Sequence, residues 1–434
     1  MRNKLFKIFL VLTIFLLPWQ TRWIFYQQQL SDSVWEYGRL GLYANMITLV
    51  LAAIFYFAQK DKLKIKNLFN SYRSRLFALT LVYFWVIHLW RALPEVAIYY
   101  LALMALTILF LFLLKQLSKK ILASTLIVSG VVQGLLAIWQ TMQQQILANK
   151  WLGIAEHLPA SLGTAVVEHG LSRMLRVYGS LPHPNILGGF LCLAALAGLW
   201  WWVNIYRLAQ KENWQGKKIK KYLVQLVLVL VSQSIIIFSL FLTFSRSAVL
   251  ALAISLLIIF IWSLRKKRRL VTSVTVKLII LSSIIFVATH FLFPGAGMSG
   301  LQPSQRLEVK STTERLVSWQ QIDWHSPYEL AFGQGLGLNT YKNLTAGQPA
   351  YEVQPIHNVF LLSLAEIGIV GFILLINLIY LYWPRYLAED WFWFLSTFIV
   401  IGLFDHYFWT TWAGWMMVAI IFASLSQKKA NNKY

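Results

Sequence analysis

Long apolar stretches separated by basic clusters limit what this chain can fold into. A helix rises about 1.5 Å per residue and the hydrocarbon core of a bilayer is about 30 Å thick, so stretches near 20 apolar residues fit membrane spans. Only 13% of the 434 residues are charged, against about 25% in an ordinary soluble domain. The sequence therefore predicts an all-α, polytopic membrane protein in which residues 1–434 form a single integral membrane domain. The expected helices, about 12 in number, cover residues 5–25, 38–58, 76–93, 95–114, 121–141, 184–206, 222–243, 247–264, 275–293, 357–383, 391–408 and 411–427.

The net charge of +23 is concentrated in alternate connections between these stretches. The positive-inside rule then puts those connections, and both termini, in the cytoplasm. This arrangement favours a membrane topology signal over nucleic-acid binding, so no nucleic-acid partner is expected. The basic clusters lie at 60–75, 115–120, 207–221, 265–269 and 428–429.

Two long connections fall on the opposite, outward side, at about 142–183 and 294–356. The second is near neutral and has ordinary soluble composition. It predicts a large extracytoplasmic loop between the ninth and tenth spans, which the helices hold in place.

Arg176 begins a polar segment that ends in His183-Pro184-Asn185, at the expected start of a span. Asn caps helices, Pro is favoured in the first turn, and a helix N-terminus beside a cation suits an anion. Two interpretations remain open for Arg176, His183 and Asn185. They either bind an anion at the outer face or simply end a loop and start a helix.

Arg246 stands in a very short outward turn between two spans, Thr243-Phe244-Ser245-Arg246-Ser247. An ionisable group at membrane depth costs on the order of 2.5–3.5 kcal/mol and usually has a partner or a task. A guanidinium matches phosphate oxygens in geometry and charge. Arg246 is therefore interpreted as a ligand for a lipid-linked diphosphate, or else as an arginine that reaches ordinary lipid head groups.

The large loop carries Arg315 and the glycine-rich turn Gly333-Gln334-Gly335-Leu336-Gly337. Leu316, Trp319 and Ile322 recur every three residues, which favours a short helix on the membrane surface. The turn lacks the strand and the Lys of a nucleotide-binding loop. It predicts a tight turn that brings the loop back toward the next span.

His357 and Asn358 stand where the loop ends and a span begins, with Gly368 and Gly371 farther along that span. A neutral imidazole can accept a proton from an attacking hydroxyl near neutral pH, although a His in this place can also cap a helix. The two glycines would let helices approach closely. Glu366, nine residues after His357, is either functional or a buried partner for an arginine.

The sequence indicates no metal site and no cofactor. The eight His are scattered, none is followed by another at i+3 or i+4, and there is no Asp-x-Asp motif.

The pattern His357-Asn358, nine residues, Gly368, two residues, Gly371 resembles the signature of the O-antigen ligase/polymerase superfamily. The upstream segments occur in the order and topology of that family. The resemblance covers residues 150–385, which would form an O-antigen ligase-like core.

The resemblance implies a membrane glycosyltransferase with a C-type fold, which transfers glycan from an undecaprenyl-diphosphate carrier in an inverting, metal-independent reaction. His357 would activate or position the acceptor hydroxyl, and Arg246 and Arg315 would bind the diphosphate with help from Arg176. The implied partners are this glycan donor, a lipid or glycan acceptor and membrane lipids, in the bacterial cytoplasmic (inner) membrane. The implied supporting residues are Asn358, Gly368, Gly371, His183 and Asn185.

The sequence leaves several functions open. The family includes ligases to lipid A-core, polymerases of O-antigen or capsule repeats and pilin oligosaccharyltransferases. The alternative class is a polysaccharide or lipid-linked oligosaccharide transporter (flippase), which would more often carry charges deep in its spans. A peptidoglycan polymerase of the shape and division family and a non-catalytic scaffold are further alternatives.

Overall fold

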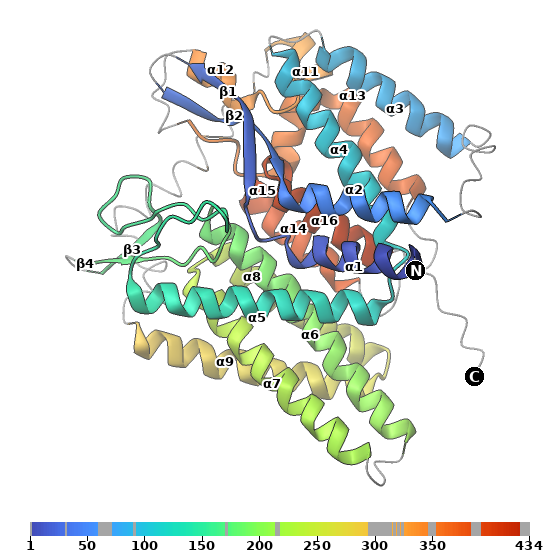
Figure 1. Ribbon diagram of the computed structural model, residues 1–434, viewed down its shortest axis with the longest axis vertical. Coiled ribbons are helices and arrows are strands. Elements are labelled where there is room, and N and C mark those ends of the chain that lie inside the picture. The colour runs from blue at the N-terminus through green and yellow to red at the C-terminus, as the bar shows by residue number, and fades with distance from the viewer. Residues whose placement is uncertain are drawn as a thin grey trace.

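The protein is a mostly helical bundle with two small β-hairpins on one side (Figure 1). The computed structural model describes residues 2–30, 33–59, 72–89, 93–169, 172–212, 218–293, 315, 318, 322, 325–345, 353–382 and 392–425. The first half contains α1 (Arg2–Phe15), β1 (Arg22–Leu30), β2 (Ser33–Tyr43), α2 (Ala44–Phe57), α3 (Tyr72–Leu89), α4 (Pro94–Leu114), α5 (Lys119–Gln143), β3 (Val166–His169), β4 (Ser172–Leu175) and α6 (Pro184–Lys211). The second half contains α7 (Lys218–Leu242), α8 (Arg246–Arg265), α9 (Arg269–Leu292), α11 (Pro327–Phe332), α12 (Asn339–Thr345), α13 (Val359–Tyr382), α14 (Trp393–Phe404), α15 (Tyr407–Thr410) and α16 (Trp412–Leu425).

Seven helices of the described chain are long and apolar enough to cross a membrane, judged by length and composition. They are α4, α5, α6, α7, α8, α9 and α13. Shorter apolar helices accompany them, at α2, within α3, and at α14 and α16. The chain is therefore a multi-pass membrane protein. Seven of the predicted spans correspond to helices of this length, and the other five correspond to shorter helices, at α1, α2, α3, α14 and α16.

The prediction of an all-α chain is wrong near the N-terminus. The expected span 5–25 ends as a helix at Phe15, and the expected span 38–58 begins at Ala44. Between them β1 and β2 form an antiparallel hairpin, and β3 and β4 form a second one farther along. An apolar run rich in aromatic residues fits a strand as well as a helix by hydropathy, which explains the error.

The two final apolar stretches form separate helices. α14 ends at Phe404, and the extended backbone of Asp405 breaks the helix before α15 and α16. The sequence predicted two spans in this region, 391–408 and 411–427.

α6 is the central helix of the bundle. In its most apolar window 94% of the residues are buried within the protein, against 22% in α9. Small residues allow this close packing, because a Cβ built on Gly130 of α5 would lie 2.6 Å from the Cβ of Ala194. The start of α6 is therefore held firmly from several sides, whereas α9 exposes most of its apolar side chains.

The β1–β2 hairpin packs on the large loop. The indole Nε1 of the buried Trp35 donates a hydrogen bond to Thr340 Oγ1 at 2.8 Å, and the Trp35 ring packs against Tyr341. Most of the predicted 294–356 loop, including Leu316 and Trp319 of the expected surface helix, lies outside the described residues. The described part of the loop returns through α11 and α12 to the start of α13.

Candidate functional site

The segment from Arg176 to Asn185 is fixed by two buried glutamines of α5. The Gln140 side-chain oxygen accepts hydrogen bonds from the backbone N–H groups of Tyr178 (3.0 Å) and Gly179 (2.9 Å), and its amide group donates to Gly179 O at 2.7 Å. Gln133 Oε1 accepts from the N–H of Ser180 at 2.9 Å. These contacts anchor the loop just before α6.

Arg176 connects three parts of the chain. Its Nε donates to Thr243 O at 2.8 Å, in the turn between α7 and α8. One terminal nitrogen donates to Asn185 Oδ1 at 2.6 Å, and Asn185 Nδ2 in turn donates to Asp405 Oδ2 at 2.7 Å. Asn185 thus bridges the guanidinium of Arg176 and the buried carboxylate of Asp405, which lies within the predicted span 391–408.

Arg246 begins α8 directly above the start of α6. Ser245 caps the helix by accepting from the N–H of Ala248 at 3.4 Å, and the side chain of Arg246 is exposed. A Cβ built on Gly188 of α6 would lie 2.8 Å from the Cβ of Ala248, so the two segments touch. The two arginine motifs, 70 residues apart in sequence, therefore lie side by side.

Three guanidinium groups act on one another here. Burial lowers the pKa of Arg176 to about 10; Tyr178 and Asp405 oppose this change, while the positive charges of Arg315 and Arg246 add to it. Arg246, in the α7–α8 turn, and Arg315, in the large loop, are thus each close enough to Arg176 to repel it. Such a cluster is favourable only with anions nearby, and Asp405 supplies a single negative charge.

His357 lies next to this cluster, at the end of the large loop. Its backbone N–H donates to Ser318 Oγ at 3.4 Å, and Ser318 Oγ donates to Arg315 O at 2.7 Å. The loop segment that carries Arg315 is thereby attached to His357. The His357 ring meets the ring of His406 edge-on, with centroids 5.0 Å apart.

Asn358 caps α13. Its Oδ1 accepts from the N–H groups of Phe360 and Leu361, both at 3.0 Å, and its Nδ2 donates to Leu403 O at 3.3 Å. His183 plays a similar part at α6, where its Nδ1 accepts from the N–H of Asn185 at 3.2 Å. Both residues start helices at the site, which is the structural interpretation that the sequence left open for His183.

Three buried groups around His357 have pKa values below their ordinary range. Burial, reinforced by Arg176, lowers the pKa of His183 to about 3. Burial also lowers the pKa of His406 to about 4, with a further contribution from His357. Burial alone would raise the pKa of Asp405, but His406, His357 and His183 together lower it. At neutral pH the site therefore holds an ionised Asp405 beside the neutral imidazoles of His183 and His406.

His406 also meets the β1–β2 hairpin. Its Nδ1 shares a hydrogen bond with Thr410 Oγ1 at 2.8 Å, and the ring of Tyr37 lies 6.4 Å away, edge-on. Burial, Glu36 and Asp405 raise the pKa of Tyr37. The hairpin thus forms one wall of the site. The sequence did not indicate this wall, because residues 22–25 and 38–43 were assigned to spans and the rest of the hairpin to the connection between them.

α13 is kinked at Gly368, and the glycine-rich turn of the large loop packs against this kink. Its backbone (φ 66°, ψ 176°) is one that side chains rarely adopt, and a Cβ on it would lie 2.4 Å from Ala331 O. The N–H groups of Gln334 and Gly335 donate to Ala365 O (2.8 Å) and Glu366 O (3.0 Å) at this kink. The glycine-rich turn therefore docks on α13 through backbone contacts.

Glu366 holds the same turn with its side chain. The buried carboxylate accepts from the N–H of Gly337 (2.9 Å), the N–H of Asn339 (3.4 Å) and Trp409 Nε1 (2.7 Å). The sequence left open whether Glu366 is functional or is the buried partner of an arginine. None of these three contacts involves an arginine, because the donors are two backbone N–H groups and an indole N–H. Glu366 positions the loop.

Gly371 allows α3 to pack closely against α13. A Cβ built on it would lie 2.9 Å from the Tyr83 ring, and Tyr83 OH donates to Ile367 O at 3.0 Å, next to the kink.

Among the residues that the structure describes, no three His, Cys, Asp or Glu side chains are grouped so as to hold a metal ion.

Residues 231–376 match the family model for O-antigen ligase. The chain contains an O-antigen ligase domain. The matched O-antigen ligase region includes Arg246, Arg315, His357, Gly368 and Gly371, whereas Arg176, His183 and Asn185 precede it. No curated protein and no solved structure matches the chain. The match covers about a third of the chain, and the family implies a membrane enzyme of the glycosyltransferase type that acts on a lipid-linked glycan.

The side chains that the sequence missed come from outside this domain. Asp405 and His406 lie in a break between two apolar helices, and Gln133 and Gln140 lie two turns apart on the same buried face of α5. A charged or amide side chain inside an apolar stretch is the signal that could have found them, because burying such a group without a partner is costly.

Proposed function

We propose that this protein transfers a glycan from an undecaprenyl-diphosphate carrier to an acceptor hydroxyl, at the membrane face that carries the two hairpins. The observation that carries the proposal is the gathering of three arginines from separate segments beside His357. The O-antigen ligase domain supports the reaction class.

The donor's diphosphate fits the arginine side of the site. Arg246 is exposed at the membrane-side turn between α7 and α8, where a head group attached to a lipid chain would arrive. Arg176 is buried behind it and is fixed by Thr243 and Asn185. Guanidinium groups remain charged and can share several phosphate oxygens, so Arg246, Arg315 and Arg176 together would stabilise the negative charge that develops on the leaving diphosphate.

His357 would act as the general base. In a single displacement the acceptor oxygen forms a bond to the anomeric carbon of the donor sugar while the bond from that carbon to the diphosphate oxygen breaks. The acceptor proton passes to the His357 imidazole, and the bonding electrons leave with undecaprenyl diphosphate. Attack opposite the leaving group inverts the anomeric carbon.

Asp405 and His406 would maintain the environment of the base. His406 meets the His357 ring, and the ionised Asp405 lies close enough to both to have its pKa lowered by them. A proton taken up by His357 during transfer would be stabilised by this carboxylate.

The reaction is tested with purified protein and an undecaprenyl-diphosphate-linked oligosaccharide. Release of undecaprenyl diphosphate is measured in EDTA, once with the donor alone and once with added lipid A-core. A polymerase would give chains of repeats from the donor alone, whereas a ligase would require the added acceptor. Metal-independent release in either arm supports the proposal.

Matched variants separate chemistry from folding. His357→Ala is compared with His325→Ala, an exposed histidine of the same loop, and Arg246→Gln with Arg265→Gln at the other end of the same helix. We expect His357→Ala and Arg246→Gln to remain inserted and lose transfer, while the two controls retain it. Transfer by His357→Ala at the wild-type rate would refute the assignment of the base. If no donor is turned over, movement of the intact lipid-linked glycan between leaflets is the next activity to measure.

A further inference from the structure

The turn between α8 and α9 is far from the candidate site. α8 begins at Arg246, which belongs to the site, and its 20 residues span about 30 Å before it ends at Arg265. The turn therefore lies at the opposite face of the membrane bundle. Nothing in the proposed reaction uses it.

Five consecutive basic residues form this turn: Arg265, Lys266, Lys267, Arg268 and Arg269, all with exposed side chains. Acidic residues do not balance them locally in sequence, because none occurs between Glu212 and Glu308. The helical hairpin α8–α9 thus presents a concentrated positive charge at one membrane face.

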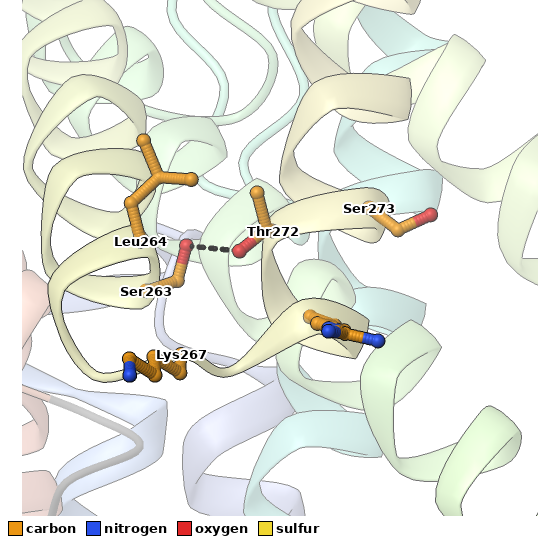
Figure 2. A pocket seen from close by; sticks show the side chains of 6 residues that line it. Ser263, Leu264, Lys267, Thr272 and Ser273 are labelled. Atoms are coloured by element: carbon orange, nitrogen blue, oxygen red, sulfur yellow. Dashed lines mark hydrogen bonds between the residues drawn. The ribbon is translucent and has the colours of Figure 1, made fainter.

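The turn also borders an open cavity of about 440 Å³ (Figure 2). Lys267 and Arg269 supply its charge, and Leu264 supplies an apolar wall. Hydroxyl groups complete the lining. The lining residues are Ser263, Leu264, Lys267, Arg269, Thr272 and Ser273.

Local hydrogen bonds give this cavity a fixed shape. The Ser263 and Thr272 hydroxyls are 2.8 Å apart and join the two helices across the turn (Figure 2). The N–H of Arg268 donates to Ser263 O at 2.8 Å, and Lys267 has a left-handed backbone (φ 52°) that reverses the chain. The cavity is part of the folded turn, and Lys267 and Arg269 are among the residues that line it.

The start of α9 adds to the positive potential. Its N-cap residue, Arg268, makes no side-chain capping bond, and the first turn of this 24-residue helix contains no acidic residue. The first N–H groups of a helix and its dipole both favour a nearby anion. This effect supplements the side chains that line the cavity.

We propose that this cavity binds the phosphate head group of an anionic phospholipid, in the leaflet opposite the candidate site. Lys267 and Arg269 neutralise the phosphate, Ser273 offers a hydroxyl donor, and the lipid chain continues along Leu264 into the bilayer. Basic pockets between membrane helices bind such head groups through the same combination of charge and depth. A lipid fits better than a free anion, because one wall of the cavity is apolar and α9 exposes apolar side chains below it.

The test is retention of a lipid by the full-length protein. Purified protein is mixed with phosphatidylglycerol or phosphatidylcholine in detergent, and bound lipid is counted by native mass spectrometry. We expect one preferentially retained phosphatidylglycerol per chain. Lys267→Gln combined with Arg269→Gln should weaken its affinity roughly thirtyfold, because each interfacial cation contributes roughly fivefold.

The matched control removes the same charge from the same turn outside the cavity, as Arg265→Gln combined with Lys266→Gln. Retention that falls equally in both double variants would overturn the proposal, since it would indicate attraction by the whole turn and no defined site. Equal retention of phosphatidylcholine would also overturn it. Displacement of phosphatidylglycerol by millimolar inorganic phosphate would assign the cavity to a free anion and overturn the lipid assignment. The readout does not depend on transfer activity, so it stands or fails separately from the proposed function.

Discussion

Replacing Glu366 should show how firmly the large loop is held on α13. Oε2 of this buried carboxylate accepts from Gly337 N–H at 2.9 Å and from Trp409 Nε1 at 2.7 Å, and Oε1 accepts from Asn339 N–H at 3.4 Å. We expect Glu366→Ala to be much more damaging than Glu366→Gln, because the two substitutions leave different numbers of buried donors without an acceptor.

The magnitudes follow from those three bonds. A buried donor left without an acceptor costs about 1–3 kcal/mol, so Glu366→Ala should destabilise the docked loop by at least about 3 kcal/mol. In Glu366→Gln the amide oxygen can occupy the place of Oε2 and keep both shorter bonds. Its NH₂ group then faces the N–H of Asn339, which loses one weak bond and the charge assistance, at a cost of about 1–2 kcal/mol.

Hydrogen exchange at the amides of Gly337 and Asn339, together with thermal unfolding, measures this difference. Glu366→Ala should speed exchange at both amides, and Glu366→Gln chiefly at Asn339. The control is Glu329→Gln, which removes a partly exposed ion pair with Lys342 (2.8 Å) in the same loop and should change stability by less than about 1 kcal/mol. Equal effects of Glu366→Ala and Glu366→Gln, or unchanged exchange in Glu366→Ala, would refute the reasoning.

Three further outcomes are expected. Gly368→Ala should release the loop to protease, because its φ of 66° costs about 1–3 kcal/mol with a side chain and the Cβ meets Ala331 O at 2.4 Å, whereas Gly402→Ala, with its nearest contact at 3.4 Å, should behave as wild type. Asp405→Asn should remain inserted but weaken the chain of hydrogen bonds to Arg176 by about 1.5–3 kcal/mol and reduce glycan transfer; unchanged transfer would contradict this. Acid should destabilise the protein: the pKa values of His183 and His406, about 3 and about 4, lie below the ordinary value near 6.5, so the unfolded chain binds protons first and stability falls as pH drops below about 6.5. Between pH 7 and pH 5 the free energy of unfolding should fall by about 2 kcal/mol for each of the two histidines, as measured by chemical denaturation. In His406→Asn the fall should be smaller by about 2 kcal/mol. A free energy of unfolding that does not change with pH would contradict the burial of these imidazoles.

The positions of the helices followed well from sequence, because hydrophobic stretches of the right length have few other ways to fold in a bilayer. Helices α4 to α9 and α13 lie within a few residues of the predicted spans. The hairpin at 22–43 did not follow. Its two outer ends, which carry Trp23, Phe25 and Tyr43, were assigned to membrane spans by hydropathy, and only long-range contacts, such as that of Trp35 with Thr340, distinguish a strand there.

The candidate site was predictable only in part for the same reason. Arg246 and His357 stand out because each is polar at the end of an apolar stretch. Asp405 does not, because its significance depends on Asn185, which is 220 residues away in sequence. Spacing within one segment can identify a local motif, whereas the partner that balances its charge comes from whichever helix the fold brings near.

The order in which the ribosome delivers these parts has a consequence for when the enzyme becomes competent. The hydrogen bond from Trp35 to Thr340 can form only after another 305 residues have been synthesised. Asn45 Oδ1 likewise accepts a hydrogen bond from Trp412 Nε1, which is 367 residues later in the chain. Asp405 is likewise synthesised after every arginine of the cluster. A nascent chain can insert its early helices and even present Arg176 and Arg246, yet the wall formed by the β1–β2 hairpin and the carboxylate beneath the base are completed only when the last helices enter the membrane. A nascent chain that has not yet reached Asp405 and Trp412 therefore lacks the contacts that these residues make with Asn185 and Asn45, and it cannot complete the site around its arginines.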